Sequence, residues 1–118
     1  MMSEAVNQAT RALCEAIRAC EEADTFRRVK EVVNENETNR VLIKEYERVQ
    51  TRLQMLAVTG QPAPQEEVQR FSDLSALLAA NQEVSAYFLA QLRLQKLMGD
   101  VFQEVGQASG LSLSFPGQ

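Results

Sequence analysis

The sequence predicts an all-α protein: a self-associating bundle of about five helices, in which helices three to five are long and antiparallel. Apolar residues recur three and four positions apart through most of the chain, which is the period of an α-helix. Trp is absent and aromatic residues make up only 6% of the chain, whereas a β-sandwich needs repeated aromatic or β-branched runs. A length of 118 residues suits one domain. We therefore predict a single helical domain over residues 1–107 and a flexible tail over residues 108–118.

Two helices are expected in the first third of the chain. The first begins after Ser3 and reaches Cys20, and its apolar stripe is rich in alanine, so that a neighbouring helix can approach it closely. A second, shorter helix is predicted to begin at Asp24, whose carboxylate would cap the free amides of the next turn. Val33 is its last apolar residue, and the polar run of residues 34–36 is expected to end it.

The next two helices form a predicted hairpin. The third helix carries a heptad seam of the coiled-coil kind, made of Leu42, Tyr46, Val49, Leu53 and Leu56. Gly60 can adopt the left-handed turn that ends this helix, and Pro62 cannot continue it. The fourth helix places Glu66 and Glu67 in its first turn, where they are favourable against the helix dipole. Its apolar stripe consists of Val68, Phe71, Leu74 and Leu78.

The fifth helix, from about Glu83 to Val105, is apolar over an unusually wide arc. That arc spans roughly 220°, whereas a surface helix needs a stripe of a little over about 100°. A second copy of the chain is the expected cover for the surplus. The predicted oligomer interface consists of Val84, Phe88, Gln91, Leu92, Gln95 and Phe102. The two glutamines lie one turn apart, either as a partly exposed seam or as a hydrogen-bonded pair that sets the register across the interface.

The residue types disfavour an enzyme or a metal protein. There is no His, which removes the commonest general base and the commonest nitrogen ligand for zinc. Cys14 and Cys20 would project about 240° apart on one helix, so one helix cannot clamp a metal or close a disulfide with both. No glycine-rich phosphate loop and no apolar run of roughly 18 residues is present. We therefore predict no catalytic, cofactor or metal site, no membrane insertion and a cytoplasmic location.

One basic stripe has two interpretations. Arg40, Lys44, Arg48 and Arg52 recur every four residues along the third helix, on the side away from its seam. They can form a solvated face, balanced by neighbouring carboxylates at Glu37, Glu45 and Glu47. Alternatively, they can contact phosphate or an acidic partner, although no aromatic residue is interleaved for stacking on bases. The formal net charge of −4 gives no support for wholesale nucleic-acid binding.

Three segments carry a family resemblance. They are DTFRRVK at residues 24–30, LIKEYERVQTRLQ at residues 42–54 and NQEVSAYFLAQ at residues 81–91. With the amino-terminal helix, they make the chain up to about residue 107 resemble the YlbF/YmcA family of small bacterial helical proteins. The matching features are patterns of helix and turn, and none is a catalytic signature.

The resemblance implies a self-associating all-α bundle that acts as a non-enzymatic regulator or adaptor. Relatives work in complexes that affect competence, biofilm formation, sporulation and RNA processing, so the implied partners are the chain itself and other regulatory proteins, with RNA reached indirectly. Some relatives hold iron–sulfur clusters through cysteines near the carboxy terminus, but residues 106–118 contain no Cys. The alternatives are direct nucleic-acid binding through the basic stripe, or a purely structural bundle protein.

Overall fold

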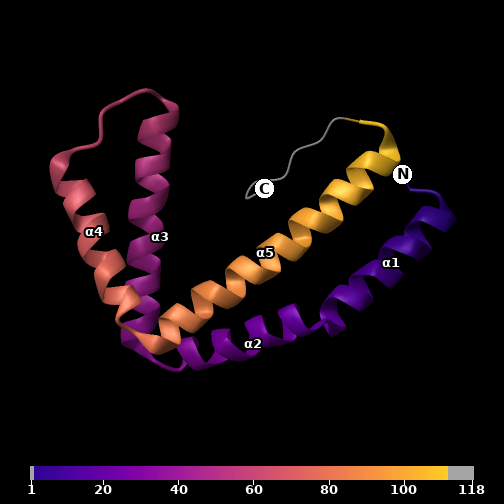
Figure 1. The fold of residues 1–118 in the computed structure, drawn as a ribbon, viewed down its shortest axis with the longest axis horizontal. Helices are drawn as coiled ribbons and strands as arrows, with labels where there is room; N and C mark the ends of the chain where they lie inside the picture. The colour runs from indigo at the N-terminus through magenta and orange to yellow at the C-terminus, as the bar shows by residue number, and fades with distance from the viewer. Residues whose placement is uncertain (1, 112–118) are drawn as a thin grey trace. The chain divides into compact units, whose positions relative to one another are not determined.

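A computed structural model describes residues 2–111, which form five α-helices and no strand within that range. The helices are α1 (Glu4–Ala19), α2 (Glu21–Asn34), α3 (Glu37–Val58), α4 (Gln65–Ala79) and α5 (Gln82–Ser109), shown in Figure 1. The all-α prediction and the number of helices are confirmed. The part of the predicted tail beyond residue 111 lies outside the described residues.

The backbone forms two compact units. The first contains α1, the start of α2 to Val29, and α5 from Leu89 onward. The second contains the end of α2 from Lys30, all of α3 and α4, and the start of α5 to Phe88. Both α2 and α5 therefore contribute residues to each unit. The prediction of a single domain stays a prediction.

The predicted start of the second helix is wrong. The helix begins at Glu21, directly after Cys20, whose extended backbone (φ −73°, ψ 159°) separates α1 from α2. The Cys20 sulfur accepts the Ala23 amide at 3.5 Å, so that it takes the capping place that we assigned to Asp24. Asp24 lies within the first turn instead, and its carboxylate pairs with Arg28 at 3.2 Å. No Gly or Pro marks this junction, which is why the sequence pattern placed it too late.

The fifth helix is longer than predicted. It continues from Val105 to Ser109 and ends where Gly110 adopts a left-handed conformation with φ of 77°. Gly106 does not stop it, because a single glycine only weakens a helix interior. The structure therefore places residues 108 and 109 in the helix rather than in the tail.

The second unit has an apolar core. Val33, Ile43, Leu78 and Val84 are buried together, with Leu42, Tyr46, Tyr87 and Phe88 packed against them. The α3 and α4 helices run antiparallel beside each other (Figure 1), and the Tyr46 and Phe71 rings stack between them at 5.0 Å. Gly60 closes α3 in the left-handed conformation, with φ of 74°, as predicted. The hairpin is thus held by the seam that the sequence indicated.

A buried network of side-chain hydrogen bonds connects the start of α3 to the turn between α4 and α5. Asn39 is only 2% exposed. Its amide nitrogen donates to a Glu83 carboxylate oxygen at 3.0 Å, and its amide oxygen accepts from Asn81 at 2.7 Å. Asn81 in turn caps α5 by accepting the Val84 amide at 3.2 Å. Both hydrogen-bonding groups of the buried Asn39 side chain are therefore satisfied, as buried polar groups require.

Candidate functional site

The exposed side of the α3–α4 hairpin collects charged and apolar side chains on one surface. Residues of α3 spaced by four and three positions share one side of that helix, and the same holds for α4. We call this surface the hairpin face; it consists of Val41, Lys44, Glu45, Arg48, Arg52 and Met55 of α3 with Glu66, Glu67, Arg70, Asp73 and Leu77 of α4. Val41, Met55 and Leu77 are the exposed large apolar side chains of this face.

Ion pairs at the centre of the hairpin face connect the two helices. Arg48 on α3 and Arg70 on α4 both donate to the Glu45 carboxylate at 2.7 Å. Hydrogen bonds from Arg48 and Arg70 lower the pKa of Glu45 from its ordinary 4.5 to about 2, so it is ionised at neutral pH. Arg52 pairs with Glu67 across the same helix–helix contact. The contacts between Glu45 and Arg70 and between Arg52 and Glu67 join α3 to α4 across the hairpin.

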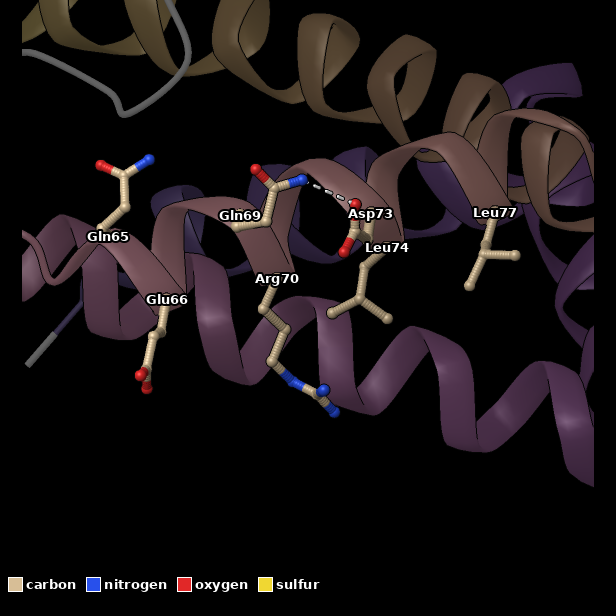
Figure 2. Close-up of a pocket in the computed structure, with 7 residues that line it drawn as sticks. All are labelled: Gln65, Glu66, Gln69, Arg70, Asp73, Leu74 and Leu77. Carbon is tan, nitrogen blue, oxygen red and sulfur yellow. Dashed lines mark hydrogen bonds between the residues drawn. The ribbon is translucent and has the colours of Figure 1, made fainter.

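A groove runs along α4 beside this cluster (Figure 2). It encloses about 660 Å³ and is lined by Gln65, Glu66, Gln69, Arg70, Asp73, Leu74 and Leu77. Gln69 donates to the Asp73 carboxylate at 2.9 Å, the bond drawn in Figure 2. Leu74 is buried, whereas Leu77 at one end of the groove is 56% exposed. The groove therefore offers an apolar end and an acidic rim, an arrangement suited to a protein partner rather than to a small anion.

The predicted basic stripe is largely engaged within the chain. Arg40 donates to the Asn34 carbonyl at the end of α2, whereas Arg48 and Arg52 pair with carboxylates. Lys44 is exposed and lines a pocket of about 130 Å³ that also contains Glu47. The predicted balance of the stripe by Glu45 is thus present. Glu67, the carboxylate that pairs with Arg52, comes from α4 and was missed. Contact of the stripe with phosphate stays a prediction.

The residues of the predicted oligomer interface on α5 differ in how exposed they are. Val84 is 0% exposed in the core of the second unit, so it has no surface to offer a partner. Phe88 is half-buried against Tyr46 and Tyr87, and Phe102 and Gln91 are also half-buried. Leu92 is 62% exposed and Gln95 is exposed. Part of the wide apolar arc is therefore covered within the chain, and self-association through α5 stays a prediction.

The two cysteines are free thiols. Cys14 is exposed and Cys20 is half-buried. Residues 2–111 contain no cluster of three Cys, Asp or Glu side chains placed to hold a metal ion. No helix in that range is both long and apolar enough to cross a membrane.

Comparison with known proteins confirms the resemblance drawn from the sequence. The model of the family described as "Control of competence regulator ComK, YlbF/YmcA" (Com_YlbF) matches residues 6–108. A UPF0342 protein of Streptococcus pyogenes serotype M3 is 30% identical over 100 residues, which cover 85% of this chain and 88% of that protein. A UPF0342 protein of Bacillus pumilus is 29% identical over 86 residues, which cover 73% of each.

Two solved structures share the fold. A DUF964 protein from Bacillus stearothermophilus superposes with a TM-score of 0.76 at 21% identity, covering 91% of this chain and 94% of that one. A chain from the crystal structure of Bacillus subtilis RicA in complex with RicF superposes with a TM-score of 0.65 at 21% identity, covering 92% of this chain and 96% of that one. At this identity the likeness concerns the fold alone.

Proposed function

Because the chain belongs to the Com_YlbF family, we propose that it is a non-enzymatic regulatory adaptor that binds other regulatory proteins and associates with itself. The observation that carries the proposal is the complex of RicA with RicF, in which a chain of the same fold was crystallised with a protein partner. The family description, control of the competence regulator ComK, supports a regulatory role. The proposal includes RicF as the kind of partner that this chain binds.

The surface best suited to a different protein lies on α5. Leu89, Leu92 and Lys96 follow one another at spacings of three and four, so they share one side of the helix. Leu89 and Leu92 are 48% and 62% exposed, and burying a leucine side chain is worth about 1.5–3 kcal/mol. Arg93 and Lys96 flank them with positive charge. We call these four residues the α5 patch, and its partner is expected to present apolar side chains with acidic neighbours.

A crosslinked pull-down from the native bacterium tests the adaptor function. The wild-type chain should recover a defined protein partner, and Leu92→Glu should lose it because a carboxylate would replace the exposed leucine. Val58→Glu is the matched control, since Val58 is also an exposed apolar residue but lies at the end of α3. Equal recovery with wild type, Leu92→Glu and Val58→Glu would exclude the α5 patch. Recovery of nothing but the chain itself would contradict the adaptor function.

Direct nucleic-acid binding has less support. Arg40, Arg48 and Arg52 already donate to a carbonyl or to carboxylates of the chain, so binding phosphate would require these contacts to be exchanged. No specific contact in the described residues favours a nucleic acid over a protein. The proposed function therefore reaches RNA only through a protein partner.

A further inference from the structure

We propose that the hairpin face binds a second copy of this chain, with α3 of each copy lying on α4 of the other. This inference rests on the self-association in the proposed function and names the surface that performs it. The two-fold axis would run parallel to the helices, so that two hairpins form a four-helix bundle. The α5 patch belongs to the first unit and takes no part in this contact.

The distribution of charge on the hairpin face supports a second copy as the occupant. The α3 side carries three cations, Lys44, Arg48 and Arg52, with one carboxylate, Glu45. The α4 side carries three carboxylates, Glu66, Glu67 and Asp73, with one cation, Arg70. A parallel two-fold axis places the basic helix of each copy on the acidic helix of the other. The other two-fold arrangement, α3 on α3, would bring like charges together and is disfavoured.

The register of the hairpin aligns individual charges. The Glu45–Arg70 contact shows which residues of the two antiparallel helices lie at the same height. Counting away from that contact, Lys44 lies level with residue 71, two residues from Asp73, and Arg48 lies level with Glu67, next to Glu66. A two-fold axis parallel to the helices preserves these heights. Lys44 of one copy therefore faces Asp73 of the other, and Arg48, while still paired with Glu45 of its own chain, lies near Glu66 of the other copy.

Two exposed apolar residues of the hairpin face, Val41 and Leu77, would also meet in the proposed dimer. Because α3 and α4 are antiparallel, Val41 near the start of α3 lies close in height to Leu77 near the end of α4. Val41 is 59% exposed and Leu77 is 56% exposed. In the proposed dimer, Val41 of one copy covers Leu77 of the other, and the contact occurs twice. The apolar end and the charged middle of the hairpin face thus find complementary surfaces in one arrangement.

Charge reversal on each helix tests the contact. The α3-reversed variant carries Lys44→Glu and Arg48→Glu, and the α4-reversed variant carries Glu66→Lys and Asp73→Lys. Each variant alone would place like charges across the dimer, so its dissociation constant should rise by about tenfold or more. An equimolar mixture of the two should recover wild-type affinity. In the mixed dimer, the acidic α3 of the first variant faces the basic α4 of the second, and the unchanged α4 of the first faces the unchanged α3 of the second. Sedimentation equilibrium and light scattering measure both effects.

The outcomes separate this inference from the proposed function. A wild-type chain that stays monomeric at micromolar concentration overturns both the hairpin contact and self-association, while the pull-down still decides adaptor binding. An oligomeric wild type whose affinity is unchanged by both reversals, or folded variants whose mixture stays monomeric, overturns the hairpin contact alone. Leu92→Glu is the control and should leave the dimer intact; loss of the dimer in this variant would place the contact on α5, as predicted from the sequence, and would overturn the hairpin contact. If Arg48→Glu reduces the helix content, the single reversals Lys44→Glu and Asp73→Lys test the same complementation.

Discussion

Replacing Asn39 with leucine should destabilise the second unit strongly. The Asn39 side chain is buried, and it bridges the Glu83 carboxylate and the Asn81 amide from the first turn of α3. Leucine has a similar volume, so the substitution removes the hydrogen bonds without opening a large cavity. It leaves polar atoms of Asn81 and Glu83 without their donor or acceptor in a partly buried place.

The expected magnitude follows from the two bonds that are lost. The amide–amide bond to Asn81 contributes about 1 kcal/mol, and the bond to the Glu83 carboxylate contributes about 1.5–3 kcal/mol. The free energy of unfolding should therefore fall by about 2.5–4 kcal/mol. This is a large fraction of the total of about 5–15 kcal/mol that typical domains have.

Urea unfolding followed by far-ultraviolet circular dichroism measures this loss, as a lower midpoint with an unchanged slope. Gln54→Leu is the matched control, an amide-to-leucine change on the exposed side of α3, and it should shift stability by less than about 0.5 kcal/mol. Asn81→Ala provides a double-mutant cycle, in which Asn39→Leu should cost less once Asn81 is gone. An Asn39→Leu midpoint equal to that of Gln54→Leu would refute the stabilising role assigned to the Asn39 hydrogen bonds.

Three further predictions follow from single residues. The pKa of Glu45 is lowered to about 2, so its carboxylate stabilises the folded chain above pH 4.5, and this contribution disappears as the pH falls toward 2. The difference in urea midpoint between wild type and Glu45→Gln should therefore close between pH 4.5 and pH 2. A difference that is independent of pH would contradict this prediction. Burial and the nearby Glu47 carboxylate raise the pKa of Tyr87 above 10.0, so Tyr87→Phe should remove the late part of the tyrosinate absorbance titration, and Glu47→Gln should move it to lower pH. Gly60 has φ of 74°, and no neighbouring atom lies within 4 Å of the place that a Cβ would take. Gly60→Ala should therefore lower the free energy of unfolding in urea by about 1–2 kcal/mol through backbone strain alone, and Gly60→Asn should lower it by less. Equal losses in the two variants would argue against a requirement for the left-handed conformation.

Local signals were sufficient for most of the helix boundaries. Ser3 caps α1 by accepting the Val6 amide at 3.3 Å, and Gly60 ends α3 as its left-handed preference predicts. These features depend on residues within one turn of each other, so the sequence pattern contains them. The junction at Cys20 was missed because its sulfur replaces an oxygen cap, and cysteine is not among the residues that usually mark a helix start.

The candidate surfaces required information that no single helix contains. Arg70 and Glu45 are 25 residues apart, and nothing in the local spacing of either helix indicates that they meet. The burial of Asn39 likewise depends on where the turn between α4 and α5 lies. On α5, the wide apolar arc was visible in the sequence, but the burial of Val84 and the exposure of Leu92 were not.

The sequence by itself determined that residues 2–111 are helical, how many helices they form and where most of these helices begin and end. It also determined family membership, because the pattern of helix and turn extends over residues 6–108. The sequence also indicated the buried seam of α3, but only the tertiary structure decided how much of the apolar arc of α5 is covered and which charges pair between helices. The physical reason is range: helix formation and capping depend on residues three or four positions apart, whereas burial and ion pairing between helices depend on the register at which distant segments pack.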